Sequence, residues 1–231
     1  MGVGSIGTIL GAYMTKAGCN VDFIHHNKII VDELNTNGAT VVGKVNFNVN
    51  VTALLPEQIE GVYDAVILLV KQTGNDIALK QLENHLDENS TVLTLQNGIP
   101  EYTISKVIGE DRTIGGVVGW GATYIKPGVS ELTTEESSLE FVIGEIDGRI
   151  TDRIYIFKEI LETMCNTKII SNLMGIRWNK ILSNATMSGM SAVLGCTFGD
   201  ILDYEEALLR AKYIANECIN VCKASGVRMA V

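Results

Sequence analysis

The spacing of three glycines near the start of the chain constrains the fold more than any other feature. Gly2, Gly4 and Gly7 stand in the pattern G-x-G-x-x-G. An apolar stripe of helical period follows them, and the short apolar run Val21–Ile24 comes next. A glycine turn that opens a helix and leads to a strand is typical of a βαβ unit that holds a dinucleotide, with the helix N-terminus facing the pyrophosphate.

Each glycine has a distinct expected role, and one part of the pattern is missing. We expect Gly2 to allow a tight turn, Gly4 to let the backbone approach a pyrophosphate, and Gly7 to let the helix pack close to a sheet. The pattern normally follows a buried central strand, whereas only Met1 precedes Gly2 here. We therefore expect two strands without their shared neighbour and an apolar gap between the helix layers, and we interpret the chain as shortened at its start.

The order of the predicted elements gives the fold class. Strands are predicted at Val21–Ile24, Ala65–Val70, Thr91–Leu95, Ile114–Val118 and Glu140–Ile143, with helices at Asn75–His85 and Tyr102–Ile108 between them. This alternation predicts an α/β fold with a doubly wound parallel sheet covered on both faces. After Gly148 the period becomes helical, with helices over 154–164, 176–194 and 204–225. We expect a nucleotide-binding domain over residues 1–167 and an incomplete all-helical domain, for substrate and dimerisation, over residues 168–231.

The last predicted helix has clear signals at both ends. Asp203 and Glu206 form a capping-box-like start, and Gly226 is the expected C-cap. Its apolar stripe consists of Leu208, Ala211, Ala215, Cys218 and Cys222. No later element covers this stripe, so we expect a homodimer, or residues missing from the C-terminal end, to bury it.

The composition indicates which kinds of partner and which cellular compartment to expect. A net charge of −9 argues against nucleic acid as the main partner. The longest apolar run, Ala65–Val70, is far shorter than the roughly 18 residues of a membrane span, and no basic segment opens the chain, so we expect no membrane association. Five cysteines without a C-x-x-C pair suit a reducing compartment, so we expect a cytoplasmic protein with no metal site.

Polar residues at strand ends indicate a ligand site. Lys71 follows the apolar run that ends at Val70, and Asn97 follows the run that ends with Leu95 and Gln96. Open α/β sheets bind ligands at the carboxyl ends of their strands. Either residue alone is more simply explained as a turn former, but two on neighbouring strands favour a ligand site.

The residues after the second predicted strand bear on cofactor choice. An NAD site usually offers a carboxylate there, whereas this chain has His25, His26, Asn27 and Lys28. Because no carboxylate would repel a 2′-phosphate, the sequence favours NADP over NAD and makes His26 a candidate cofactor contact. The alternative is that both histidines are surface residues unrelated to the cofactor.

One helix carries a line of polar residues. Lys180, Asn184 and Ser188 recur every four residues between apolar neighbours. An ammonium and a carboxamide one turn apart can hold an oxygen-rich ligand, with the lysine giving a proton to a developing alkoxide. The alternative is a solvated helix face with a snorkelling lysine.

Together these residues resemble the ketopantoate reductase (2-dehydropantoate 2-reductase) family. The resemblance is carried by Gly2–Gly7, LLVK at 68–71, LQNG at 95–98, GGVV at 115–118 with Gly121 and Ala122, Pro127-Gly128, and WNKILSN at 178–184. It implies a Rossmann-type domain followed by an all-helical domain, and NADPH-dependent reduction of a 2-oxo acid to a 2-hydroxy acid.

The resemblance also implies residue roles. Lys180 corresponds to the proton donor and substrate ligand, and Asn184 to a substrate ligand, with Ser188 next in line. The NADP-binding positions are Gly2, Val3, Gly4, Ser5, Ile6, Gly7, Lys71, Asn97 and Ala122.

Two departures keep alternatives open. The family often has asparagines where Ser188 and Phe198 stand, and it continues past Val231 into helices that carry a substrate-binding serine and a glutamate near the nicotinamide. The alternatives to pantoate formation are therefore reduction of another 2-oxo acid and a non-catalytic NADP-binding protein.

Overall fold

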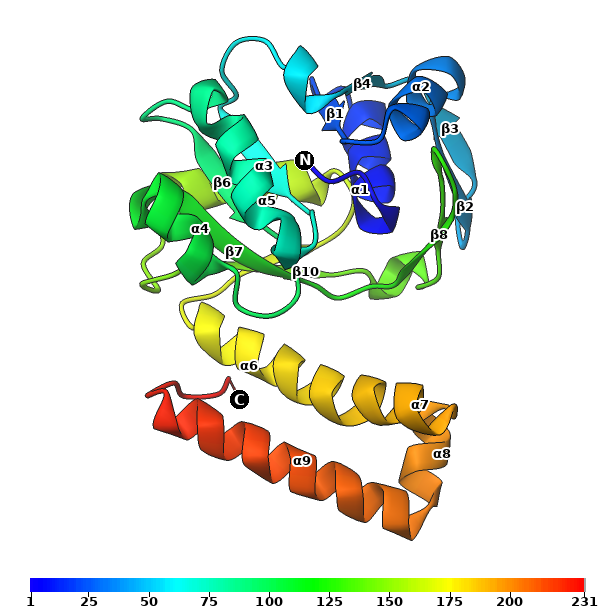
Figure 1. Ribbon diagram of the computed structural model, residues 1–231, viewed down its shortest axis with the longest axis vertical. Helices are drawn as coiled ribbons and strands as arrows, with labels where there is room; N and C mark the ends of the chain where they lie inside the picture. Colours follow the sequence, from blue (N-terminus) through cyan, green and yellow to red (C-terminus); the bar gives the residue numbers. More distant parts are fainter. Residues whose placement is uncertain (231) are drawn as a thin grey trace. The chain divides into compact units, whose positions relative to one another are not determined.

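A computed structural model describes residues 1–230, which form two compact units (Figure 1). The first unit comprises Met1–Gln96 and Pro100–Ser171, and the second comprises Asn97–Ile99 and the residues from Asn172 onward. The expected boundary between residues 167 and 168 lies within strand β11 (Thr167–Ile169), which belongs to the first unit.

The main sheet of the first unit has five strands in the order β11-β10-β7-β6-β5. Strands β5 (Ala65–Leu68), β6 (Thr91–Thr94) and β7 (Thr113–Val118) are parallel, which confirms the predicted α/β architecture. Strand β10 (Phe141–Glu145) is antiparallel to β7, so the sheet is mixed toward this edge rather than wholly parallel as predicted.

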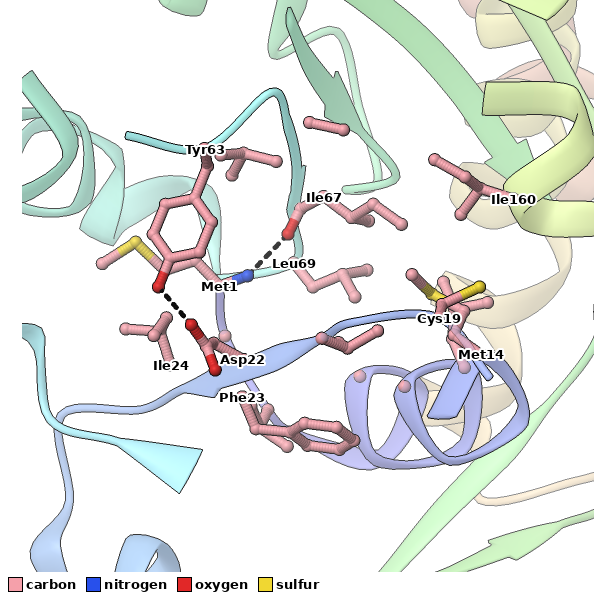
Figure 2. Close-up of a pocket in the computed structure, with 18 of the residues that line it drawn as sticks. Met1, Met14, Cys19, Asp22, Phe23, Ile24, Tyr63, Ile67, Leu69 and Ile160 are labelled. Atoms are coloured by element: carbon pink, nitrogen blue, oxygen red, sulfur yellow. Dashed lines mark hydrogen bonds between the residues drawn. The ribbon is translucent and has the colours of Figure 1, made fainter. Parts of the chain in front are cut away.

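The expected gap in the sheet is present. Strand β1 (Asp22–Ile24) pairs with β4 (Thr52–Leu54) in a separate two-stranded sheet, and within residues 1–230 it has no pairing with β5. A cavity lined by residues of both β1 and β5 lies between the two strands (Figure 2). Over most of their length, no strand therefore lies between β1 and β5.

A second sheet was not predicted. It has the order β3-β2-β9-β8, formed by Phe47–Val49, Ala39–Gly43, Val129–Leu132 and Ala122–Lys126. Helix α1 (Ser5–Lys16) packs against this sheet, with Ile9 and Leu10 in the same apolar cluster as Val41 and Leu132.

Two apolar clusters, on opposite faces of the main sheet, form the core. Leu93 in β6 and Leu95 just after it belong to one cluster, which includes residues of α1 and α5 (Asp152–Glu162). Val92 in β6 belongs to the other cluster, which includes residues of α3 (Asn75–Leu82) and α4 (Glu101–Ile108). Side chains alternate between the faces of a strand, so a strand covered on both sides is apolar throughout. Helix α2 (Lys28–Asn37) and 3₁₀ turns at Pro56–Gln58, Gln72–Gly74, Glu83–His85, Glu110–Arg112 and Glu136–Ser138 complete the unit.

The second unit is helical, as predicted. Helix α6 (Leu173–Ser183), a π-helical turn (Asn184–Ser188) and α7 (Gly189–Leu194) form one rod. Helix α8 (Phe198–Asp203) connects this rod to α9 (Glu205–Ala224), which returns beside it (Figure 1). The predicted helix 176–194 is confirmed, but it starts earlier and contains the π turn.

Two expectations about α9 are wrong. Its N-cap is Tyr204 without a side-chain cap, and the capping box lies at α8 instead, between Thr197 and Asp200. The stripe expected to be uncovered is shielded by α6, the π turn and α8, which leave Ala211 and Cys222 buried. Ser225 is the C-cap, followed by Gly226 at φ +73°.

Candidate active site

The glycine loop is held against the carboxyl ends of β1 and β5. Gly2 has φ +95°, and its N–H donates to the Ile24 carbonyl at 3.0 Å. A Cβ on Gly2 would lie 2.4 Å from the Val70 nitrogen. The first glycine is therefore required both by its backbone conformation and by the close approach of the segment that follows β5.

The other two glycines differ in their surroundings. Gly4 is the N-cap of α1, and a Cβ there would have no neighbour within 4 Å. A Cβ on Gly7 would lie 2.7 Å from the Gly2 carbonyl oxygen, so this glycine lets the helix pack on its own loop rather than on the sheet as expected. The open side of the loop lies at Gly4, beside the first N–H groups of α1.

Val3, Ser5 and Ile6 complete the predicted loop. Val3 is buried in the core, whereas Ser5 and Ile6 form the first turn of α1 and are half-buried. No acidic side chain occupies this turn. The N-terminal end of α1 therefore presents main-chain donors without a carboxylate that would repel a phosphate.

The ends of β5 and β6 are joined by a buried amide that the sequence analysis did not select as a site residue. The Gln96 side chain is 6% exposed, and its Nε2 donates to the Val70 carbonyl and, at 2.6 Å, to Asn75 Oδ1. Its Oε1 accepts from the Thr94 hydroxyl at 3.1 Å. Gln96 thus fixes the backbone next to Lys71, whose own side chain is exposed. The LQNG segment contained this residue, but no spacing rule marked its role.

The loop after β1 has a defined hydrogen-bond arrangement. The Asn27 N–H donates to His25 Nδ1 at 3.0 Å, and Asn27 Oδ1 caps α2 by accepting from the Ile29 N–H. The rings of His25 and His26 stack with centroids 4.6 Å apart. Burial, followed by the proximity of His26, lowers the pKa of His25. His25 is therefore held neutral near pH 7, with Nδ1 as the acceptor.

Ala122 and Asn97 lie in different units. Ala122 begins β8, is half-buried, and packs against the apolar cluster that includes α1. Asn97 is exposed and belongs to the second unit, as do Lys180, Asn184 and Ser188.

Within the second unit, the π turn changes the geometry of the predicted polar line. Lys180 and Asn184 are half-buried and Ser188 is exposed. Four α-helical residues rotate by about 400°, so each step of four overshoots one turn by about 40°. Because a π turn rotates less per residue, the step from Asn184 to Ser188 falls short of the α-helical rotation and offsets the overshoot of the step before it.

A threonine hydroxyl in the π turn bonds to two carbonyls of the preceding helical turn. Thr186 Oγ1 donates to the Leu182 carbonyl at 2.7 Å and to the Ser183 carbonyl at 3.3 Å. In an α-helix the same carbonyls accept main-chain N–H groups, so the hydroxyl competes with those donors. Such turns are frequent at functional sites.

The C-terminal segment is tied to α6 and to its N-cap residue. Asn172 Nδ2 donates to the Arg228 carbonyl at 3.0 Å, and Asn179 Nδ2 donates to the Ala230 carbonyl at 2.9 Å. A Cβ on Gly175 would lie 2.6 Å from the Arg228 carbonyl oxygen. These positions were not predicted, because nothing in the sequence marks contacts between segments so far apart.

The first unit therefore fits a dinucleotide. The open face at Gly4, the donors of α1 and Lys71 after β5 are the features of this unit that suit a pyrophosphate in a doubly wound fold. Within residues 1–230, no group of three or more His, Cys, Asp or Glu side chains is placed to bind a metal, and no helix is long and apolar enough to cross a membrane. The fold and the loop define a Rossmann-type nucleotide-binding protein with a helical second unit.

Comparison with known proteins gives the family. Residues 1–148 match the model of "Ketopantoate reductase PanE/ApbA", and residues 172–231 match that of its C-terminal part. The 2-dehydropantoate 2-reductase of Pyrococcus horikoshii is 27% identical over 100% of this chain and 75% of its own length. That of Streptococcus pyogenes serotype M3 is 25% identical over 99% of this chain and 74% of its own length.

Two solved structures share the fold. A 2-dehydropantoate 2-reductase from Geobacter metallireducens has a TM-score of 0.89 at 24% identity, covering 100% of this chain and 76% of its own. A ternary structure of D-mandelate dehydrogenase with NADH and anilino(oxo)acetate has a TM-score of 0.89 at 19% identity, covering 99% of this chain and 74% of its own.

The chain belongs to the ketopantoate reductase family. It is an NADP-dependent oxidoreductase of the 2-dehydropantoate 2-reductase type.

Proposed function

We propose that the protein reduces 2-dehydropantoate to pantoate with NADPH, a step of pantothenate biosynthesis. The observation that carries the proposal is the pair Lys180 and Asn184, half-buried and one turn apart on the rod, in a chain whose first unit has the glycine loop of a dinucleotide site. The match of both units to the same family supports it.

The chemistry assigned to each residue follows from its functional group. NADPH, when bound, supplies the hydride that reduces the 2-oxo carbon. The Lys180 ammonium donates a hydrogen bond to the carbonyl oxygen and then the proton that completes the alcohol. Asn184 Nδ2 and the Ser188 hydroxyl orient the substrate carboxylate through hydrogen bonds. General acid catalysis of this kind contributes roughly 10²- to 10⁴-fold to a rate.

The remaining predicted residues are assigned to the cofactor. Main-chain N–H groups of the loop Gly2–Gly7 bind the pyrophosphate, and Lys71 and Asn97 are further ligands of NADP. His26 contacts the adenosine ribose, where the absence of a carboxylate tolerates a 2′-phosphate. Ala122 lines the cofactor site from β8.

A second candidate function is reduction of a different 2-oxo acid. It is favoured by the fold shared with D-mandelate dehydrogenase and by Phe198, whose side chain is 49% exposed at the start of α8. An aromatic ring there suits an apolar substrate side chain better than the hydroxyl-bearing side chain of 2-dehydropantoate.

A substrate panel tests both candidates. NADPH consumption is followed at the nicotinamide absorbance band with 2-dehydropantoate, phenylglyoxylate and pyruvate, at equal concentrations. We expect the highest kcat/KM with 2-dehydropantoate. A higher value with phenylglyoxylate would select the second candidate, and NADPH binding without turnover of any of the three would contradict both.

We also propose a homodimer and a cytoplasmic location. Leu202, Leu209 and Tyr213 are exposed apolar side chains on α8 and α9, which a second copy would cover. The five free cysteines suit a reducing compartment. Light scattering at two concentrations tests the assembly, and Tyr213→Glu should shift it toward the monomer.

A further inference from the structure

Two asparagines of the chain are followed directly by glycine, at Asn37-Gly38 and Asn97-Gly98. Asparagine is chemically labile in proteins, and a following glycine makes it more so, because glycine has no Cβ to hinder its own nitrogen and allows many backbone conformations. The two pairs have the same covalent structure, and both asparagines are exposed. Any difference in their reactivity therefore comes from the backbone around them.

The reaction at such a pair consumes only water. The glycine nitrogen forms a bond to Cγ of the asparagine, the bond from Cγ to the amide nitrogen breaks, and ammonia leaves with the proton of the glycine N–H. Water then opens the resulting succinimide ring at either carbonyl group, which gives aspartate or isoaspartate. The first step requires a glycine nitrogen that can turn toward the side chain and is not held in a hydrogen bond.

The pair Asn37-Gly38 is held by the end of helix α2. The Gly38 N–H donates to the Leu34 carbonyl at 2.9 Å. The Asn37 carbonyl accepts from Asn48 Nδ2 at 2.8 Å. A Cβ on Gly38 would lie 2.4 Å from the Val49 carbonyl oxygen, so neighbouring backbone also confines this glycine. The Gly38 nitrogen is therefore not available to attack the side chain before it.

The pair Asn97-Gly98 lies in an irregular segment between β6 and α4. Gly98 has φ +82°, and within residues 1–230 its N–H donates to no main-chain or side-chain acceptor. Its nitrogen therefore keeps the freedom that the Gly38 nitrogen lacks. Because Asn97 is exposed, water can also reach a ring formed at this position.

We propose that Asn97-Gly98 is a site of spontaneous deamidation in the folded protein, whereas the fold protects Asn37-Gly38. The product at position 97 is a mixture of aspartate and isoaspartate, formed without an enzyme or a cofactor. The reaction replaces a carboxamide, which can donate hydrogen bonds, with an ionised carboxylate, which can only accept them. Isoaspartate also lengthens the main chain by one methylene group.

The consequence for activity rests on the proposed function, in which Asn97 is a ligand of NADP. A negative charge at this position repels the phosphates of the cofactor, and the loss of the amide N–H groups leaves a hydrogen bond unmade. Deamidation then lowers cofactor affinity slowly and irreversibly as the protein ages. We expect Asn97→Asp, which reproduces one of the two products, to bind NADPH about tenfold more weakly than the parent.

Peptide mapping by mass spectrometry tests the modification itself. The protein is incubated at neutral pH and physiological temperature, and the fractions of aspartate and isoaspartate at positions 37 and 97 are followed over time. In the folded protein, we expect the reaction at Asn97 to be faster than at Asn37 by about tenfold or more. In denaturing urea the two rates should become similar, since both asparagines then precede a glycine in an unfolded chain.

NADPH affinity, measured on the same aged samples, tests the consequence separately. The affinity should fall in step with the modified fraction at Asn97. The matched control is Asn97→Gln, whose longer side chain has to close a larger and less favourable ring and therefore deamidates far more slowly. Ageing should leave the NADPH affinity of this variant at its own starting value.

Two results would overturn the proposal. One is an unmodified Asn97 in the folded protein after the time in which the sample in urea is converted. The other is an equal rate at Asn37 and Asn97 in the folded protein, which would show that the fold does not distinguish the two pairs. Conversion of Asn97 with an unchanged NADPH affinity would support the modification and contradict the cofactor role proposed for Asn97.

Discussion

Gly2 and Gly4 stand two residues apart and are required for different physical reasons. Gly2 combines φ +95° with a Val70 nitrogen 2.4 Å from the place of a Cβ, whereas Gly4 has φ −88° and open space. The motif predicts both glycines but does not separate the one that the fold needs from the one that a ligand would need.

Alanine at each position separates these roles. Gly2→Ala should lower the free energy of unfolding by more than about 2 kcal/mol, because a side chain there meets backbone atoms. Gly4→Ala should change stability by less than about 1 kcal/mol and weaken NADPH binding at least tenfold, since it fills the open side of the loop. Urea unfolding and cofactor titration measure the two effects. Equal loss of stability in both variants would contradict this assignment.

Gln96 is a positioning residue whose role only the structure reveals. Replacing it with alanine leaves the Val70 carbonyl and Asn75 Oδ1 without this donor in a buried place. We expect Gln96→Ala to cost about 2–4 kcal/mol of unfolding free energy and to raise the KM for NADPH through the displaced Lys71 backbone. The control is Asn84→Ala at an exposed amide, which should have little effect. An unchanged KM for NADPH with reduced stability would show that Gln96 is structural only.

Among the elements, the sequence pattern correctly predicted the strands that have continuous apolar runs. Strands β5, β6 and β7 are covered on both faces and contain no charged residue that would obscure them. Strand β2 was missed because its pattern, in which Ala39 and Val41 are buried and Thr40 is half-buried, is short and is flanked by glycine. The antiparallel direction of β10 was also missed, since apolar content carries no information on strand direction.

The π turn is the element-scale feature most open to test. Thr186→Val removes the hydroxyl bonds to Leu182 and Ser183 while keeping a β-branched side chain of similar size. The turn should then relax toward α-helix and rotate Ser188 away from the Lys180 line. We expect the KM for the 2-oxo acid to rise about tenfold and NADPH affinity to stay the same. Thr186→Ser, which keeps the hydroxyl, should behave like the parent, and a normal KM in Thr186→Val would contradict the role of the turn.

At the scale of the whole molecule, the buried Met1 ammonium makes the free energy of unfolding depend on pH. The folded state lowers the pKa of the Met1 ammonium from 8.0 to about 5. Between these values the unfolded chain binds more protons than the folded chain, so stability rises with pH over this window and is lost as pH falls through it. Three pKa units correspond to at most about 4 kcal/mol.

The pH effect is measured as a difference between two chains. Unfolding free energies of the free and the Nα-acetylated protein are compared from pH 5 to pH 8. The free chain should lose stability relative to the acetylated chain as pH falls, and the difference should level off above pH 8. If the difference in unfolding free energy is the same from pH 5 to pH 8, the Met1 ammonium is exposed to solvent in the folded protein.

The sequence predicted much of the whole molecule, because both units have patterns that local residues set. The glycine loop, the alternation of strands and helices, the gap in the sheet and the helical second unit all follow from spacing within short segments. Gln96, the second sheet and the tie from Asn172 to Arg228 depend on segments far apart in the chain, which no local pattern records.

The most direct test of the proposed reaction is the rate of hydride transfer with Lys180 replaced. Lys180→Ala should reduce single-turnover oxidation of bound NADPH by 2-dehydropantoate by roughly 10²- to 10⁴-fold, because the proton donor to the carbonyl oxygen is lost. NADPH affinity, measured on the same sample, should change less than about twofold. An unchanged single-turnover rate would contradict the account, because proton donation by Lys180 is its central claim.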